Sequence, residues 1–166
     1  MELRRPRLAD KETVLEMMAE FEQAQSPHDG GFWEAEAFFY EDWLEGNQDK
    51  EMGLGLPDGY VPSIQLVAFD ESGHALGFLN LRLRLNKALL NFAGHIGYSI
   101  RPSERGKGYA KEALRQGLQV AEEKNIKKAL VTCSVENPAS RAVIVSNGGV
   151  FEDVRNGVER YWIDLE

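Results

Sequence analysis

Cysteine is nearly absent from this sequence of 166 residues, which contains only Cys133. A single thiol excludes an intrachain disulfide and a zinc site built on cysteines. Cys133 lies among apolar residues of a predicted strand, where a small buried hydrophobe is far commoner than a nucleophile. The three histidines, His28, His74 and His95, are widely separated and predict no metal site.

Long apolar runs are also lacking. No stretch of about 18 apolar residues, the length that a bilayer requires, occurs in the sequence. The first residues, MELRRPRL, have no apolar core of the kind that a signal peptide needs. We therefore expect a soluble, cytoplasmic protein that does not enter a membrane.

Positive charge is scarce, since 19 Lys and Arg stand against 27 Asp and Glu and give a formal net charge of −8. Affinity for a nucleic-acid backbone depends on Lys and Arg, so this balance argues against a general nucleic-acid binder. It fits a cationic small molecule or a peptide amine better as a partner, although acidic surfaces also keep proteins soluble. The composition, 43% hydrophobic and 28% charged, is ordinary for a single globular domain over residues 1–166.

The pattern along the chain predicts a mixture of strands and helices. Helices are predicted after Asp10, from about Ala35 to Gly46, after Tyr109 and over residues 137–147. Strands are predicted at 2–8, 63–69, 75–85, 94–100, 129–135, 150–154 and 158–163. In the third of these, Arg82 and Arg84 share one face with Asn80. The two arginines belong either to a solvated face or to a cleft in which they meet a carboxylate of a substrate.

The most informative stretch is a strand, a turn and a helix in succession. The apolar strand Ile96 to Ile100 leads through a basic turn with Gly106 and Gly108 into a strongly periodic helix. A helix start leaves backbone N–H groups without partners and carries about half a positive charge. The glycines permit positive φ and close approach of a ligand, while Arg105 and Lys107 add charge. The junction therefore predicts a phosphate site.

The pattern Arg-x-x-Gly-x-Ala, at Arg105, Gly108 and Ala110, resembles the acetyl-CoA pyrophosphate loop of the GNAT superfamily of N-acyltransferases. The turn is not a Walker loop, because GxxxxGK[ST] is absent, nor a dinucleotide fingerprint, because the third glycine is misplaced. Further along, Asn137-x-x-Ser140 and the glycine turn at 148–149 resemble a later helix of that family. The resemblance covers residues 65–155, and the amino-terminal third only by its order of elements.

The resemblance implies an α/β (α+β) fold with a central mixed, mostly antiparallel sheet of about six or seven strands flanked by about four helices. It also implies a splay between the strands at 94–101 and 128–135, where acetyl-CoA would bind as co-substrate without a metal. The N–H of Ile100 would polarise the thioester carbonyl. The residues implied to bind the cofactor are Ser99, Ile100, Arg101, Arg105, Gly106, Lys107, Gly108, Tyr109, Ala110, Asn137 and Ser140.

Acetyl transfer to an amine also needs a route for the amine proton. An amine with a pKa near 10.4 loses its proton at neutral pH at a cost of roughly 4 kcal/mol, so a base or a chain of waters is expected. His95 is the first candidate because its unshifted pKa near 6.5 suits the task, and the alternative is a strand histidine satisfied by a neighbour. Glu136 is the second candidate, and the alternative is an exposed carboxylate at a strand end. His28 and His74, in a loop and a turn, are weaker candidates.

One position departs from the family. Many members carry a tyrosine seven residues after the Asn, as the acid that protonates the departing thiolate, and Ile144 stands there in this sequence. Tyr98, Tyr109 or water would then have to replace that tyrosine.

Two classes of function follow. The first is an N-acetyltransferase that moves an acetyl group from acetyl-CoA to a primary amine of a small molecule or peptide by direct transfer in a ternary complex. The second is a non-catalytic acyl-CoA binding module. Both would bind the cofactor, and only the enzyme would release free thiol when an amine is added. The terminal strand, with Tyr161 and Trp162, is a candidate surface for a homodimer.

Overall fold

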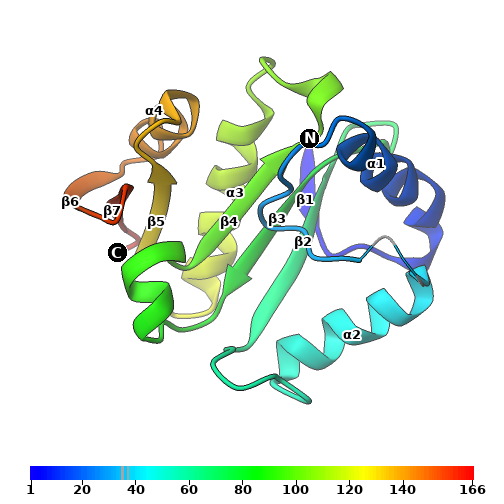
Figure 1. Ribbon diagram of the computed structural model, residues 1–166, viewed down its shortest axis with the longest axis horizontal. Coiled ribbons are helices and arrows are strands. Elements are labelled where there is room, and N and C mark those ends of the chain that lie inside the picture. Colours follow the sequence, from blue (N-terminus) through cyan, green and yellow to red (C-terminus); the bar gives the residue numbers. More distant parts are fainter. Residues whose placement is uncertain (35, 37) are drawn as a thin grey trace.

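The computed structural model describes residues 1–34, 36 and 38–166, which form a seven-stranded sheet with helices on both faces (Figure 1). The strands are β1 (Glu2–Arg4), β2 (Ser63–Phe69), β3 (Ala75–Arg82), β4 (Ile96–Ile100), β5 (Lys128–Ser134), β6 (Val150–Arg155) and β7 (Val158–Asp164). The α-helices are α1 (Lys11–Gln23), α2 (Tyr40–Met52), α3 (Tyr109–Glu123) and α4 (Pro138–Ser146). Short helical turns are η1 (Leu8–Asp10), η2 (Leu89–Ala93) and η3 (Pro102–Glu104). Within the described residues, no helix combines the length and the apolarity needed to cross a bilayer.

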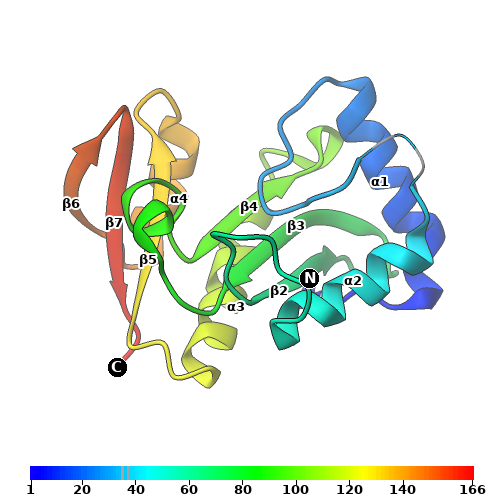
Figure 2. The same ribbon diagram turned by 60° about the horizontal axis from the view of Figure 1, so that its bottom comes forward.

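The sheet has the strand order β1-β2-β3-β4-β5-β7-β6. Among the described strands, every neighbouring pair is antiparallel except β4 and β5. These two run parallel and share one paired position, Ile96 with Val131. They diverge beyond it, so that β5, β6 and β7 stand apart from β1–β4 in Figure 2. The predicted fold class and the predicted splay are both confirmed.

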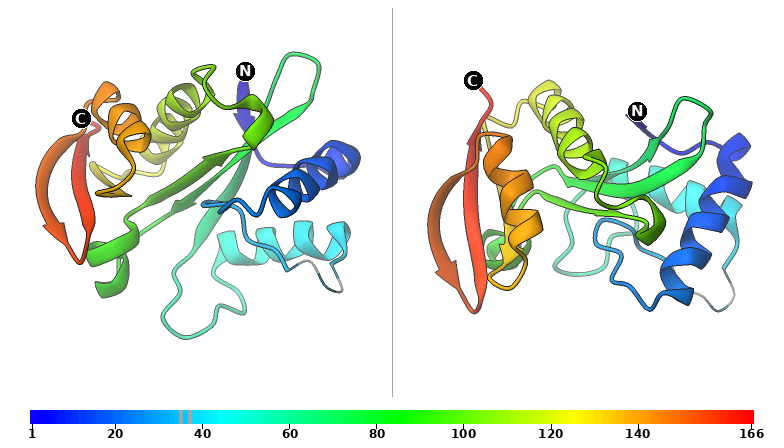
Figure 3. Two further views of the ribbon diagram at one scale, coloured as in Figure 1. Left: turned by 45° about the horizontal axis from the view of Figure 1, so that its top comes forward. Right: turned by 90° about the horizontal axis from the view of Figure 1, so that it is seen from above.

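Each face of the β1–β4 half of the sheet is covered by its own hydrophobic cluster. Figure 3 shows α1 and α2 on one side of these strands and α3 on the other. Alternation along β3 assigns its residues to the two sides, because successive side chains of a strand point to opposite faces. Leu79 and Leu81 pack in the cluster that contains Leu114 of α3, whereas Phe78 packs in the cluster that contains Phe21 of α1.

Helix α3 is held close to the sheet by the periodic residues that predicted it. The buried positions of α3 lie on one stripe: Ala113, Leu114, Gly117, Leu118 and Ala121. Gly117 permits the close approach, because a Cβ there would lie 2.8 Å from a methyl carbon of Leu79. The helix ends at Glu123, and Asn125 just beyond it adopts the left-handed conformation with φ 64°. Its start is thereby fixed beside the end of β4.

Three predicted ends were wrong. Strand β1 ends at Arg4 rather than at Leu8, and strand β3 ends at Arg82 rather than at Leu85. Helix α2 begins at Tyr40 and continues to Met52 rather than ending near Gly46. A glycine inside a helix costs only about 1 kcal/mol, and the end of α2 is set by Gly53, whose φ of 78° forms a left-handed cap. The predicted start of this helix at Ala35 lies outside the described residues.

Candidate active site

The divergence of β4 and β5 opens a cleft of about 1020 Å³. Its walls are β4, the start of α3, the end of β5 with α4, and the loop of residues 26–32 between α1 and α2. The predicted cofactor residues that line this cleft are Ser99, Ile100, Arg105, Gly106, Gly108, Tyr109, Ala110, Asn137 and Ser140. Segments that are far apart in the sequence are thus brought to one cavity.

The start of α3 forms one end of the cleft. Gly106 and Gly108 adopt φ values of 77° and 84°, which L side chains rarely accept. In the part of the chain that the structure describes, the amides of Gly108, Tyr109, Ala110 and Lys111 have no hydrogen-bond partner, as expected at the start of a helix. These N–H groups and the helix dipole together favour an anion at this end.

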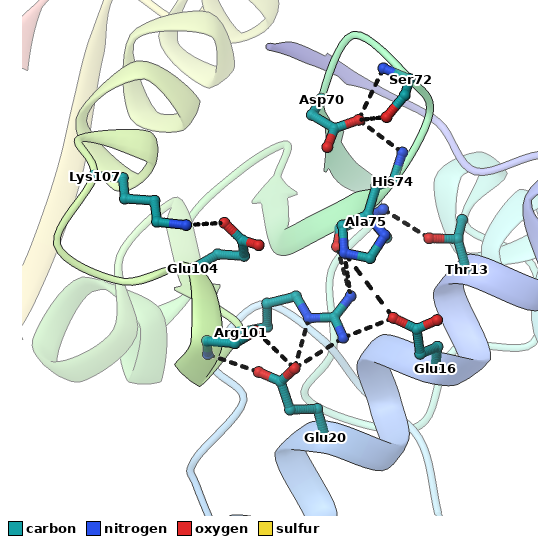
Figure 4. Close-up of polar contacts among 11 residues, drawn as sticks. Thr13, Glu16, Glu20, Asp70, Ser72, His74, Ala75, Arg101, Glu104 and Lys107 are labelled. Carbon is teal, nitrogen blue, oxygen red and sulfur yellow. Dashed lines mark hydrogen bonds and ion pairs between the residues drawn. The ribbon is translucent and has the colours of Figure 1, made fainter.

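Arg105 adds a full positive charge to this anion site. Its Nε donates to the carbonyl of Ile100 at 2.9 Å, and its Nη2 donates to Ser26 Oγ at 2.7 Å. Both acceptors are neutral, so the guanidinium charge is not cancelled by these contacts. Lys107 differs, because its Nζ pairs with Glu104 at 2.8 Å and the residue does not line the cleft (Figure 4).

The open edge of β4 lines the middle of the cleft. The amide of Arg82 donates to the carbonyl of His95, and the amide of Arg101 donates to the carbonyl of Leu76, both across the β3–β4 pair. Odd-numbered positions of β4 therefore direct their backbone groups toward β3, and the even-numbered Tyr98 and Ile100 direct theirs toward β5. Because β4 and β5 pair only at Ile96 and Val131, the amides of Tyr98 and Ile100 face the open cleft.

Arg101 points away from the cleft, contrary to its predicted place among the cofactor residues. Its guanidinium is bound by Glu16 and Glu20 of α1, with Nη2···Oε1 distances of 3.0 and 2.8 Å (Figure 4). Only 4% of the residue is exposed, and its Nη1 also donates to the carbonyl of Ala75. The Arg101 guanidinium and the hydroxyl and amide of Ser103 lower the pKa of Glu20 to about 2, against the effect of its burial. Arg101 therefore fastens α1 to the sheet.

His95 is also outside the cleft and is only 6% exposed. Its amide donates to the carbonyl of Leu130 at 2.8 Å, and its Nδ1 accepts the amide proton of Leu130 at 2.9 Å. Burial, with a smaller effect of the nearby Arg82 charge, lowers the pKa of His95 to about 4. The ring therefore stays neutral at pH 7 and joins β4 to β5 where the two halves of the sheet meet. This is the satisfied strand histidine that the sequence left open as an alternative.

Glu136 and Asn137 follow β5 in a turn before α4. Glu136 is exposed and does not line the cleft. Asn137 caps α4 as predicted, because its Oδ1 accepts the amide proton of Ser140 at 3.1 Å. Asn137 and Ser140 both line the cleft, opposite β4.

Tyr98 crosses the cleft from β4 to α4. Its hydroxyl lies 2.8 Å from Ser140 Oγ, and burial raises the pKa of Tyr98 to about 12. The phenol is therefore protonated at neutral pH and can donate a hydrogen bond. Ile144, in contrast, is fully buried in the core and does not line the cleft. An acid at the Ile144 position is thus absent, and Tyr98 is the phenol on the β4 wall of the cleft.

The loop of residues 26–32 lines the cleft, although the sequence analysis named only His28 in it, as a weaker candidate base. This loop lies against β4, because Ser99 Oγ donates to the carbonyl of Asp29 and a Cβ on Gly30 would lie 2.3 Å from the carbonyl oxygen of Gly97. His28 lines the cleft as well, with its Nδ1 2.6 Å from the carbonyl oxygen of Gly31. The Gly30-Gly31 pair was the available signal, since a loop that contacts a strand backbone needs residues without side chains.

Of the two arginines predicted on one face of the third strand, Arg82 belongs to the cleft. It closes β3 and lines the cleft beside Gly97, whereas Arg84 is exposed and outside it. The prediction of a cleft position is therefore correct for Arg82, and the prediction of a solvated face is correct for Arg84. No group of three or more His, Cys, Asp or Glu that could hold a metal ion occurs among the described residues.

Comparison with known proteins gives a family match. The family model of the acetyltransferase (GNAT) domain matches residues 1–150. No curated protein matches the sequence. Among solved structures, an acetyl transferase of Salmonella typhimurium that modifies the N-terminal serine of the 50S ribosomal subunit protein L7/L12 is 20% identical, with a TM-score of 0.67 over 99% of this chain and 94% of that one. Spermidine N-acetyltransferase of Vibrio cholerae, solved with CoA and spermine, is 20% identical, with a TM-score of 0.62 over 99% and 95%. At these identities the structural likeness shows a shared fold.

Proposed function

The chain belongs to the GNAT acetyltransferase family, and from this premise we propose that it transfers an acetyl group from acetyl-CoA to a primary amine of a small molecule or peptide. Transfer would be direct, within a ternary complex. The observation that carries the proposal is the cleft itself: β4 and β5 diverge after one paired position, and the start of α3 forms one end of the cleft. The two relatives named above, one acting on spermidine and one on an N-terminal serine, support an amine as acceptor.

The residues present fit a nucleotide pyrophosphate at the start of α3. The amides of Gly108, Tyr109 and Ala110 would bind phosphate oxygens, and Arg105 would supply the charge. Lys107 would act at a distance, because it is engaged with Glu104 outside the cleft. Acetyl-CoA, when bound, supplies the thioester whose carbonyl the amine attacks.

The β4 edge is suited to stabilise charge on a carbonyl oxygen. The amides of Tyr98 and Ile100 face the cleft and are fixed by the pairing of β4 with β3. Donors held in place by a sheet need no reorganisation when negative charge develops, which makes such donors effective. We assign the N–H of Ile100 to this role, which the family resemblance also implies.

Tyr98 is suited to assist the departing sulfur as a hydrogen-bond donor. Its pKa of about 12 lies well above that of an ordinary thiol, near 8.5, so complete proton transfer to the thiolate would cost about 5 kcal/mol. A hydrogen bond from the phenol to the thiolate has no such cost. The contact with Ser140 holds the hydroxyl at the α4 side of the cleft.

His28 is suited to accept the amine proton. A carbonyl oxygen only accepts, so the contact between His28 Nδ1 and the Gly31 oxygen assigns the proton to Nδ1. The lone pair of the neutral ring then lies on Nε2, which is the atom of a general base. Stacking of the ring on Trp33, with centroids 3.8 Å apart, fixes its plane. His95 has neither access to the cleft nor a free Nδ1, so it is not part of this proposal.

Calorimetric titration with acetyl-CoA, then with CoA, tests the proposal first. Binding of both, followed by release of free thiol when amines are added, is the expected result. Binding without thiol release over a broad amine panel would favour the non-catalytic acyl-CoA binding module. No binding at millimolar acetyl-CoA would contradict both.

A further inference from the structure

Arg82 is a half-buried cation whose guanidinium has no hydrogen-bond partner among the described residues. In the part of the chain that the structure describes, its guanidinium makes no hydrogen bond, and its Nη1 is completely enclosed. No carboxylate of a described residue forms an ion pair with it within 4.0 Å. Asp29, the acid whose charge acts on Arg82, belongs to the exposed edge of the 26–32 loop. A guanidinium in such a setting is costly to bury unless an anion joins it.

The surroundings of Arg82 are already saturated with hydrogen bonds among themselves. Gln65 Nε2 donates to the carbonyl of Gly30 at 2.7 Å, and Asn80 Nδ2 donates to Gln65 Oε1 at 3.3 Å. Both residues lie on the same face of the sheet as Arg82, because they alternate with core leucines. Gln65 and Asn80 thus hydrogen-bond to the loop and to each other, and neither supplies an acceptor to the Arg82 guanidinium beside the cleft.

The position of Arg82 separates it from the phosphate end. The guanidinium lies against Gly97, since a Cβ on that glycine would be 3.3 Å from Nη1. Arg105, in contrast, is bonded to the carbonyl of Ile100. Three residues of extended strand separate Gly97 from Ile100, a distance of about 10 Å. The anion that Arg82 meets is therefore distinct from the pyrophosphate and lies on the side of the cleft lined by the 26–32 loop.

We propose that Arg82 binds a carboxylate of the acceptor, so that the substrates are amines that also carry a carboxylate, such as amino acids or peptides with an acidic group near the amine. The inference rests on the proposed function and narrows it. A polyamine offers no anion to Arg82 and would place like charges together, which is unfavourable in a partly desolvated site. Arg82 is thus the residue that sets acceptor specificity.

Matched pairs of acceptors test this proposal. Each amino acid of a panel is compared with its own carboxamide, and spermidine serves as a cationic acceptor without a carboxylate. We expect kcat/KM for the preferred acid to exceed that for its amide by about 10- to 100-fold, the range of a charge-assisted hydrogen bond. Arg82→Gln should abolish this preference by raising KM for the acid, so that kcat/KM becomes equal for the acid and its amide. Arg84→Gln is the control, because Arg84 is exposed and outside the cleft.

Equal kcat/KM for acids and amides, or a preference that survives Arg82→Gln, would overturn the proposal while amine acetylation stands. If no amine of the panel is acetylated, the proposed function is wrong. The role of Arg82 is then tested by measuring whether the acids bind to the protein. The CoA-saturated protein is titrated with the same acids and amides by calorimetry, and absence of acid binding that depends on Arg82 overturns the inference. Arg82→Lys keeps the charge and should recover part of the preference, so it replaces Arg82→Gln if circular dichroism shows that the latter does not fold.

Discussion

The two ends of the cleft are built from different kinds of structure. The end proposed to bind the pyrophosphate, here the phosphate end, is local: a strand, a glycine turn and a helix start within about a dozen residues supply backbone amides and one arginine. The end proposed to bind the acceptor, here the acceptor end, is assembled from distant segments, with Arg82 from β3 and His28 from the loop after α1. The first kind of site depends on backbone geometry, and the second depends on which side chains the fold brings together. Mutations should therefore affect cofactor binding and acceptor turnover separately.

Gly108→Pro should have the largest effect and should act on the phosphate end alone. Proline fixes φ near −65° and has no N–H, whereas Gly108 has φ 84° and begins the row of free amides. We expect loss of measurable acetyl-CoA binding in calorimetry. Gly59→Pro is the control, because Gly59 has φ 83° and equally open surroundings but does not line the cleft. Unchanged affinity in Gly108→Pro would refute the anion site.

His28→Asn should come next and should act on the acceptor end alone. The Asn amide can still donate to the Gly31 carbonyl, but it offers no base. Loss of a general base typically costs about 100-fold or more, so kcat should fall by that factor at pH 7. Acetyl-CoA affinity should be unchanged, and the rate should recover as the pH rises and the amine loses its proton to water. A kcat equal to that of the wild type would exclude His28 as the base.

Tyr98→Phe should have a smaller effect, about 10-fold on kcat, because one hydrogen bond to a leaving sulfur is lost. The effect should shrink with acyl donors whose thiol is more acidic, since a better leaving group needs less assistance. Rates with two thioesters of different thiol pKa measure this directly. An equal loss with both donors would show that Tyr98 serves only to pack the cleft.

His95→Gln should change activity least and should alter the pH dependence of stability instead. In the unfolded chain the pKa of a histidine is near 6.5, whereas in the folded protein the pKa of His95 is about 4. The contribution of neutral His95 to the free energy of unfolding is therefore fully present above pH 6.5 and decreases as the pH falls toward 4. The loss attributable to His95 is as much as about 3 kcal/mol over that window. Urea unfolding at pH 7, 6 and 5 gives the free energy of unfolding at each pH. This free energy should fall less steeply with decreasing pH in His95→Gln than in the wild type. An identical pH dependence in the two proteins would contradict the role of His95 between β4 and β5.

The sequence predicted the glycine turn and the start of α3 well because their determinants are neighbours in the chain. Gly106, Gly108 and the periodic stripe of α3 specify a turn and a helix start wherever the segment is placed. The positions of the other site residues depend on which strands and helices pack against them. The family resemblance implied that Arg101 binds the cofactor, but its amide donates to Leu76 and its guanidinium is bound by the two glutamates of α1.

Burial explains the other differences at the site. His95 has the residue type of a base, and only the structure shows that Leu130 occupies its Nδ1. His28 was ranked low because it lies in a loop, and nothing in its local sequence shows that the loop lies against β4 through Gly30 and Gly97. Arg82 was visible as one of two arginines on a strand face, but the end of β3 at that residue separates it from Arg84.

The single paired position between β4 and β5 has a consequence for aggregation. A strand edge with unpaired amides is normally a liability, because a strand of another molecule can add to it. β4 carries such an edge in the middle of the sheet, at Tyr98 and Ile100. The 26–32 loop and α4 stand on either side of this edge and form the walls of the cleft. The free amides of β4 therefore lie inside a cleft rather than along an open margin of the sheet, where a strand of another molecule would most easily add.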